Sequence, residues 1–536
     1  MFDKDKAGLA LISLVAVLLS VVLSSPVVGA LIFLLGLAKY LPRIIMKNRG
    51  RKHPDTIEVR QRKSIFRAKL GFWSAATTVM FALFLFFFRP WFHDIVMAVY
   101  KQPAFFLFVF SAVMFWLFLH LKQIRIAWVF AASAALFFIV MLFAPVIMQC
   151  YIVRSTDYIK ISSLPDSDQL RLVPQAVARR YLEDSLQKSY ETVGQLDIVN
   201  IWGSPKWTAP RIPDGFILYL TQGVNGLLFA DASSTDRKTS MVSQAMPVGE
   251  GIGITDNIYW KLFKKKYFVD IDEVYYVLDG NSVITLANVI KYRLRFPVMV
   301  PYFAGIYVVR GSEIQYVEAK DVPGLEYLKG NWAYPERLAR LYVDSYKYHL
   351  GVWNAWFLHK DQIEITDVYG QNNQQPFLMP TVDGMKWMVA TEPYGRSYGV
   401  FKIFVVDALT GRIEMLELDE DSTLTGPVSI VSYVKKKFPT IDWGTARIIE
   451  PRPYIIHGEL YWMLSITPYD FAGITYTVLA NAGTNEIIGF VSDADVEAFV
   501  MRGVYTQSDQ LSDNSPAIRR KISEIEEKLA ELKSLV

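Results

Sequence analysis

Cysteine is almost absent from this sequence. The 536 residues include one cysteine, Cys150, so an internal disulfide and a cysteine-based metal cluster are both excluded. No Asn-x-Ser/Thr acceptor site with a permitted middle residue is present. The net charge of +4 comes without a strongly basic domain, which argues against a nucleic-acid-binding protein. These absences favour a prokaryotic or viral source over animal secretion.

Common catalytic and cofactor motifs are missing as well. The sequence has no Walker loop, no Gly-x-Ser-x-Gly elbow, no His-Glu-x-x-His and no Cys-x-x-Cys. Two acidic groups have the residue types that bind calcium, although solvated surface is the interpretation we favour: Asp270, Asp272 and Glu273, and Glu417, Asp419, Glu420 and Asp421. We therefore expect no catalytic residue, no cofactor and no metal ion.

Charged residues are also missing from the interiors of long apolar segments near the N-terminus. A transmembrane helix needs about 20 mostly apolar residues. Five segments meet or nearly meet this requirement and predict an α-helical membrane anchor over residues 1–149: 7–23, 27–46, 70–88, 104–121 and 127–148. The first two could instead form a re-entrant hairpin. Because charges inside a membrane usually mark ion or proton paths, the uncharged spans favour an anchor over a channel.

Lysine and arginine gather in the loop after the second predicted span. This loop contains Lys47, Arg49, Arg51, Lys52, Arg60, Arg62 and Lys63. Basic residues in short loops favour the cytoplasmic side of a membrane. We therefore expect a cytoplasmic N-terminus and an extracytoplasmic region over residues 150–536. The loop could also contact anionic lipid or a cytoplasmic partner, although setting the topology is sufficient to explain it.

The rest of the chain predicts an α+β fold. Helical spacing covers residues 173–188 and 336–350, and strand-like segments lie between residues 198 and 315. Asp279-Gly280-Asn281 predicts a hairpin turn. We expect one or more α+β modules over residues 150–330.

Two blocks within residues 331–500 repeat each other in order. Trp387 and Trp462 are 75 positions apart, and later positions match at an offset of 74. The matching residues are Trp387, Pro393, Tyr394, Asp407 and Gly411 in the first copy, and Trp462, Pro468, Tyr469, Asn481 and Asn485 in the second. Each copy predicts strand, loop, strand, tight turn and strand, with a helix over 427–437 between the copies. Gly411 and Asn485 occupy a turn position that favours positive φ. A more diverged unit could end near residues 303–314.

The strand Phe404-Val405-Val406-Asp407-Ala408, followed by Thr410-Gly411 and Ile413, resembles the end of a PepSY domain. PepSY domains are small extracytoplasmic helix-plus-sheet modules, often duplicated and tethered to a membrane. The second copy departs from the pattern, with Asn481 and Asn485 in place of Asp and Gly. The resemblance implies a binding or inhibitory module, often connected with peptidase regulation, and carries over no catalytic residue.

The C-terminus predicts a coiled-coil helix after a polar linker. The linker covers residues 501–514, and Ser515-Pro516 is a favourable helix start. Apolar residues then recur at heptad spacing over residues 515–536: Ile518, Ile522, Ile525, Leu529, Leu532 and Val536. A helix this short needs a partner, so the stripe either oligomerises or packs on its own domain.

Three functions remain open at this level. The leading one is a membrane-anchored extracytoplasmic scaffold that binds other proteins, contacts membrane lipids and self-associates, without binding nucleic acid. The second is a regulator of an extracytoplasmic peptidase. The third is a ligand sensor or an enzyme with an unidentified site. A cleft lined by Trp353, Trp356, Trp387 and Trp462 could hold that site, although such a stripe of tryptophans more often belongs to the core.

Overall fold

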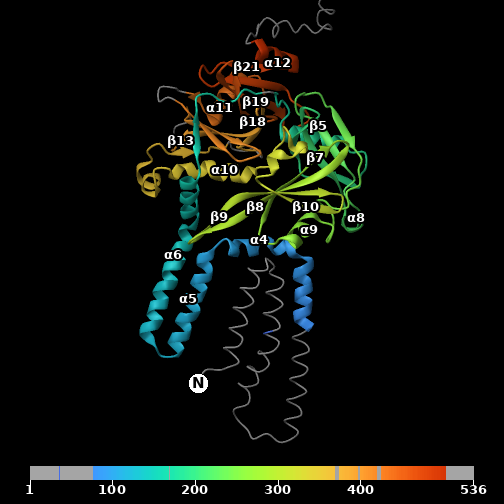
Figure 1. The fold of residues 1–536 in the computed structure, drawn as a ribbon. Coiled ribbons are helices and arrows are strands. Elements are labelled where there is room, and N and C mark those ends of the chain that lie inside the picture. The colour runs from blue at the N-terminus through green and yellow to red at the C-terminus, as the bar shows by residue number, and fades with distance from the viewer. Residues whose placement is uncertain are drawn as a thin grey trace, which may run out of the picture.

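The computed structural model describes residues 76–502, apart from residues 168, 368–372, 396–398 and 419–423, together with Gly36. A bundle of apolar helices lies at one end, and a sheet-rich α+β region lies at the other (Figure 1). We call residues 158–502 the head region. The α+β character expected for this part of the chain is confirmed.

The expectation of five membrane helices is wrong. Within the described residues two helices are long and apolar enough to cross a membrane, α5 (Pro103–His120) and α6 (Ile124–Ser155). A third is added if residues Ala76–Phe87 and α4 (Arg89–Tyr100), which meet at a bend of 91°, form one broken span. The predicted segments 7–23 and 27–46 and the basic loop after them lie outside the described residues. So does the coiled-coil stripe over 515–536, and the described part contains no coiled coil.

Pro90 explains why the apolar helix Ala76–Phe87, which lies within the third predicted span, does not run straight into α4. Proline has no backbone N–H, so the carbonyl of Phe86, four residues earlier, loses its helical partner. That carbonyl accepts instead from Trp260 Nε1 and from Arg89 Nε, each at 3.1 Å. The chain therefore turns, and α4 lies across the end of the helix bundle (Figure 1).

Four times in succession, a helix in the head region is followed by a four-stranded antiparallel meander. In the first unit α7 (Gln175–Ser185) precedes β3 (Asp197–Ile201), β4 (Ser204–Pro213), β5 (Leu227–Asp231) and β6 (Thr239–Val242), with β2 (Glu191–Val193) on β4 and α8 (Phe216–Thr221) before β5. In the second α9 (Ile258–Lys265) precedes β7 (Asp270–Asp279), β8 (Ser282–Arg295), β9 (Val298–Arg310) and β10 (Glu313–Glu318), and the short helices η1 (Val322–Gly324) and η2 (Glu326–Leu328) follow. The predicted turn at Gly280 joins β7 to β8 with a φ of 61°.

The third and fourth units complete the head region. In the third α10 (Glu336–Ser345), η3 (Tyr346–Tyr348) and η4 (Asn354–Leu358) precede β12 (Phe377–Thr381), β13 (Gly384–Pro393), β15 (Lys402–Asp407) and β16 (Ile413–Glu417), with β11 (Ile363–Glu364) on β13. In the fourth α11 (Pro427–Lys437) precedes β18 (Ala446–Ile456), β19 (Glu459–Pro468), β20 (Tyr476–Asn481) and β21 (Ile487–Phe490), and α12 (Asp493–Arg502) follows. The short strands β14 (Gly399–Val400) and β17 (Leu424–Thr425) pair with each other. The helix predicted over 427–437 is confirmed.

A buried tryptophan fixes the start of the helix in three of these units. In each, an indole N–H donates to the backbone carbonyl two residues before the helix begins: Trp207 to Val173 at 2.9 Å before α7, Trp387 to Tyr334 at 2.9 Å before α10, and Trp462 to Thr425 at 2.7 Å before α11. A buried tryptophan needs such an acceptor for its N–H. Each bond therefore ties a helix start to the second strand of its own meander.

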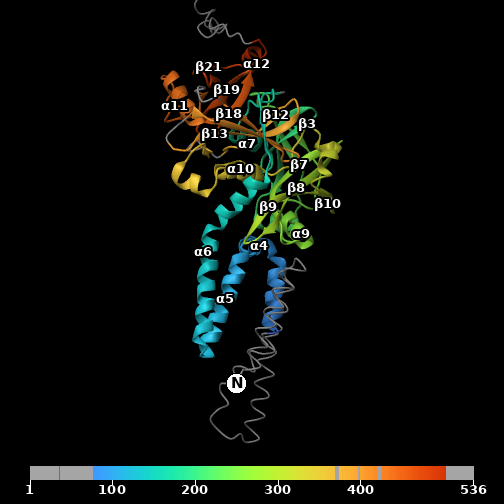
Figure 2. The same ribbon diagram turned by 60° about the vertical axis from the view of Figure 1, so that its left-hand side comes forward.

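The head region is joined to the helix bundle without a flexible linker. Helix α6 ends at Ser155, and β1 (Tyr158–Ile161) then pairs in parallel with β16 of the third unit. Figure 2 shows α6 running from the bundle into the head region. On the other side α4 packs against α9, where the His93 ring stacks on Phe263 at 3.8 Å between centroids and His93 Nε2 donates to the carbonyl of Val269 at 2.8 Å. Two separate contacts thus hold the head region in one orientation.

Candidate binding cleft

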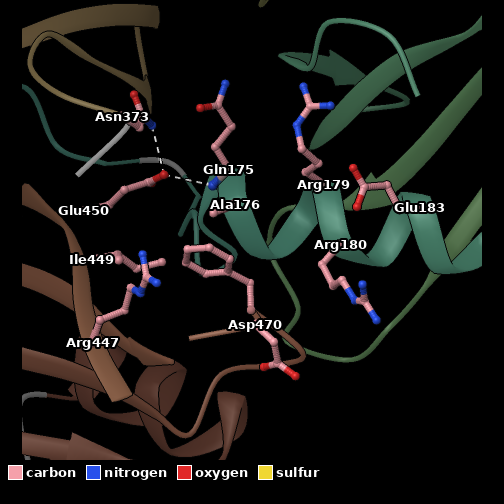
Figure 3. A pocket seen from close by; sticks show the side chains of 11 residues that line it. Gln175, Ala176, Arg179, Arg180, Glu183, Asn373, Arg447, Ile449, Glu450 and Asp470 are labelled. Carbon is pink, nitrogen blue, oxygen red and sulfur yellow. Dashed lines mark hydrogen bonds between the residues drawn. The ribbon is translucent and has the colours of Figure 1, made fainter. Parts of the chain in front are cut away.

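The first turn of α7 lies between two adjoining cavities in the head region. We call them together the α7 cleft. The outer cavity, of about 240 Å³, is shown in Figure 3, and the inner cavity is about 300 Å³. Both are lined by Gln175, Arg179 and Asn373. The other walls come from every unit, including Asp197 of the first, Glu273 of the second, Glu336 of the third and Arg447 of the fourth.

Glu450 holds α7 in this position. The Glu450 carboxylate accepts from the backbone N–H of Gln175 at 2.8 Å and from Asn373 Nδ2 at 2.9 Å, as the dashed lines in Figure 3 show. It also accepts from Arg171 Nη2 at 2.8 Å. A carboxylate at a helix N-terminus satisfies an unpaired N–H and complements the helix dipole.

The backbone of Glu450 is strained where it makes these contacts. Its φ is 49°, a left-handed value that residues other than glycine rarely adopt. The pairing of β18 with β19 shifts register at this point, between Ile449 and Arg452, so Glu450 belongs to a β-bulge. Bulges redirect side chains and often lie beside functional sites. Here the bulge directs the carboxylate towards α7.

Two buried guanidinium groups accompany this one carboxylate. Arg171 is 2% exposed and Arg452 is 0% exposed. Arg452 donates to the backbone carbonyls of Arg171 and Leu172, and its Nε lies 4.0 Å from Glu450. The Arg171 guanidinium also lies 4.6 Å from the centre of the Trp207 ring. This network joins the segment before α7 to the fourth unit, and its charge balance depends on Glu450.

Three carboxyl groups line the inner cavity, those of Asp197, Glu273 and Glu336. Burial, reinforced by neighbouring carboxylates, raises the pKa values of Asp197 and Glu273 well above their usual range. Burial raises the pKa of Glu336 to about 7. Asp197 is 8% exposed, and its Oδ2 has no hydrogen-bond partner among the described residues, nor has Oε2 of Glu273. Raised carboxyl pKa values and unpaired buried oxygens inside a cavity are features of binding sites.

Aromatic and cationic groups complete the walls. Indole rings of Trp207, Trp332 and Trp387 line the inner cavity. In the outer cavity the Arg447 guanidinium lies 4.6 Å from the centre of the Phe471 ring, and its Nε is buried without a partner among the described residues. Charges of both signs are thus presented close together, which suits a ligand with hydrogen-bonding groups of both kinds.

The four tryptophans considered for a cleft do not come together in the structure. Trp353 and Trp356 are exposed at 69% and 42%, whereas Trp387 and Trp462 are buried in the two separate hydrophobic cores. Of these four residues Trp387 alone lines the α7 cleft.

Two pairs of residues from the repeated blocks, Asp407 with Gly411 and Asn481 with Asn485, occupy matching turns. Asp407 Oδ1 accepts from the N–H groups of Leu409 and Thr410, and Asn481 Oδ1 accepts from those of Gly483 and Thr484. Gly411 and Asn485 have φ values of 78° and 60° at equivalent positions of these turns. Among the remaining block residues, Tyr394 and Tyr469 are about half exposed, at 49% and 51%, next to Pro393 and Pro468. These four residues lie outside the walls of the α7 cleft.

The acidic group at Asp270 is not solvated surface. Asp270 is 6% exposed and pairs with Lys101 of the helix bundle at 2.6 Å and with Arg337 at 3.1 Å. These two cations lower the pKa of Asp270 despite the opposing effect of burial. Asp270 therefore joins the head region to the bundle. Within the described ranges no group of three or more His, Cys, Asp or Glu side chains could hold a metal ion.

The sequence contains no local signal for the residues that form the α7 cleft. Arg171 and Glu450 are 279 positions apart, and Asp197, Glu273 and Glu336 come from three different units. A search of the chain against family models, curated proteins and solved structures finds no match.

Proposed function

We propose that this protein is a membrane-anchored scaffold whose head region binds another protein and takes a segment of that partner into the α7 cleft. The observation that carries this proposal is the convergence of all four units on one cleft with unpaired buried polar atoms. Such atoms cost free energy unless a ligand or water satisfies them. A polypeptide segment supplies backbone donors and acceptors of both kinds.

The attachment of the head region supports a scaffold in particular. Helix α6 continues through two residues into β1. Helix α4 is fixed to α9 by the stacking of His93 on Phe263, and the residue after it, Lys101, forms an ion pair with Asp270 of β7. A partner bound in the cleft is therefore held at a constant height and orientation relative to the helix bundle. We place the head region on the extracytoplasmic side, following the basic loop at residues 47–63.

We also propose that the four units of the head region are repeated modules related to PepSY domains. Its support is the succession of helix and meander in the four units, and the indole bonds of Trp207, Trp387 and Trp462 at matching places. The first unit has no counterpart among the repeated sequence blocks, but it shares a backbone contact with the third unit. The carbonyl of Ala232 accepts from the N–H groups of Leu172 and Val173, and the carbonyl of Ala408 accepts from those of Ala333 and Tyr334. If the partner is a peptidase, the protein is its regulator.

Site-specific photo-crosslinking in the native membrane tests the proposal. A photoreactive residue at Ala176, on α7 in the outer cavity, is expected to give an adduct with a second polypeptide. The matched control carries the same residue at Val491, which is 74% exposed and lies outside the cleft. Mass spectrometry of the adduct identifies the partner. Absence of an Ala176 adduct, together with a monomeric mass after gentle extraction, would refute the scaffold.

A further inference from the structure

Exposed apolar side chains gather at two places beside α6, and we call them together the apolar rim. One place is the tip of the β8–β9 hairpin, where Leu294 is 55% and Phe296 is 60% exposed. The other is η4 with the residue before it, where Trp353, Phe357 and Leu358 are 69%, 59% and 65% exposed. Large apolar side chains exposed in a group mark an interaction surface.

Direct contacts place both parts of the rim against the C-terminal half of α6. Tyr151 of α6 donates its hydroxyl hydrogen to the backbone carbonyl of Phe296 at 3.1 Å. Behind the hairpin tip, Val298 and Val300 pack on Ala144 and Ile152 of α6. On the η4 side, the rings of Trp356 and Phe143 lie 5.9 Å apart. The rim is therefore continuous with the apolar surface of a candidate membrane span.

Helix α4 marks the height of the hairpin tip along the axis of the helix bundle. This helix bends by 91° from the apolar helix before it, as expected for a segment that lies in the plane of a membrane interface. Figure 1 shows the β8–β9 hairpin reaching down to the level of α4 where α5 and α6 meet the head region. The hairpin tip therefore lies at the height at which the bundle would leave the apolar part of a bilayer.

The charges around the rim fit lipid headgroups. Arg293 and Arg295 alternate with Leu294 and Phe296 at the hairpin tip and are themselves exposed. Lys264 and Lys265 are exposed at the end of α9, which packs on α4. Aromatic residues with nearby lysine and arginine are typical of membrane interfaces, where rings lie among headgroups and cations meet phosphate.

We propose that the apolar rim is seated in the headgroup layer of the membrane that holds α5 and α6. Its apolar side chains enter the interface, and Arg293 and Arg295 contact lipid phosphate. The head region thus rests on lipid along α6 as well as being fixed to the helices, and this contact is independent of any partner in the α7 cleft.

Depth-dependent fluorescence quenching tests this proposal in the full chain. Cys150, the only cysteine, is replaced by serine, and one cysteine is introduced by Phe296→Cys, Phe357→Cys or the control Val491→Cys. Val491 is 74% exposed and directly follows β21 in the chain, and β21 lies at the end of the head region away from the helix bundle (Figure 1). Each variant is labelled with an environment-sensitive dye and reconstituted into phosphatidylcholine–phosphatidylglycerol nanodiscs with or without lipids that carry a nitroxide near the headgroup.

We expect blue-shifted emission and at least twofold quenching by the nitroxide lipid at positions 296 and 357, and neither effect at 491. Equal, weak quenching at all three positions would overturn the proposal. Blue-shifted emission without quenching would also overturn it, because another protein surface and not lipid would then cover the rim. Leu294→Cys provides a second hairpin position, and the α7 cleft is intact in every variant.

Discussion

Replacing Glu450 by glutamine tests the account of the α7 cleft most directly. The change keeps the shape of the side chain and removes its charge. Arg171 and Arg452, which are 2% and 0% exposed, then lose the carboxylate that Glu450 supplies. The N–H of Gln175 and the side-chain amide of Asn373 both donate to Glu450. The NH2 group of the new glutamine is also a donor, so it cannot accept these hydrogen bonds where it replaces a carboxylate oxygen.

The magnitude follows from the burial of this network. Breaking a buried ion pair by removing one partner costs about 3–5 kcal/mol, because an uncompensated charge remains in the interior. A loss of 1 kcal/mol lowers the Tm of a domain of about 150–250 residues by roughly 2–4 °C. The head region is larger than such a domain, so the shift is nearer to about 1–2 °C per kcal/mol. We therefore expect Glu450→Gln to lower the Tm of the full chain in detergent by roughly 3–10 °C, measured by tryptophan fluorescence.

Asp236→Asn is the matched control, because Asp236 forms an ion pair with Lys238 in which both side chains are about two-thirds exposed, at 69% and 66%. This control should leave the midpoint unchanged, since exposed ion pairs contribute little. If Glu450→Gln unfolds at the same temperature as Asp236→Asn, the carboxylate does not hold the network together. The start of α7 and the two buried arginines would then be held by contacts other than the Glu450 carboxylate.

Two further predictions concern the helix starts and the inner cavity. Trp462→Phe removes the N–H that satisfies the carbonyl of Thr425, and should destabilise the head region by about 1–3 kcal/mol in denaturant unfolding; no loss would show that the indole bond is dispensable. The pKa of Glu336 is raised from 4.5 to about 7, so its favourable contribution is present below pH 4.5 and is lost as the pH rises through about 7. Glu336→Gln should flatten that part of the profile of unfolding free energy against pH, and an unchanged slope would contradict the assignment.

Local patterns in the sequence predict individual elements of the head region well. The helix over 427–437 and the hairpin at Gly280 agree with the structure because they depend on neighbours in the chain. Helix periodicity and a glycine with positive φ are local signals. Pro90, just after the end of the third predicted span, is a local signal of the same kind, because proline removes a backbone hydrogen bond wherever it occurs in a helix.

The acidic residues show where local reasoning fails. From the sequence, Asp270 and Glu273 belong to a solvated group on one strand. In the structure Asp270 is paired with Lys101, which lies 169 positions earlier, and Glu273 lies in a cavity with residues of other units. Whether a carboxylate is solvated depends on what packs over its strand, and the neighbouring sequence does not contain that information.

The sequence by itself determined an apolar helical N-terminal part, an α+β remainder and the residues that form its turns. It could do so because hydrophobic length, periodicity and positive φ act over a few neighbouring residues. The tertiary structure alone decided how the four units are arranged, which carboxyl groups are buried and that Glu450 meets Arg171 across 279 positions. These depend on contacts between distant segments, whose burial and charge are established only when the units pack together.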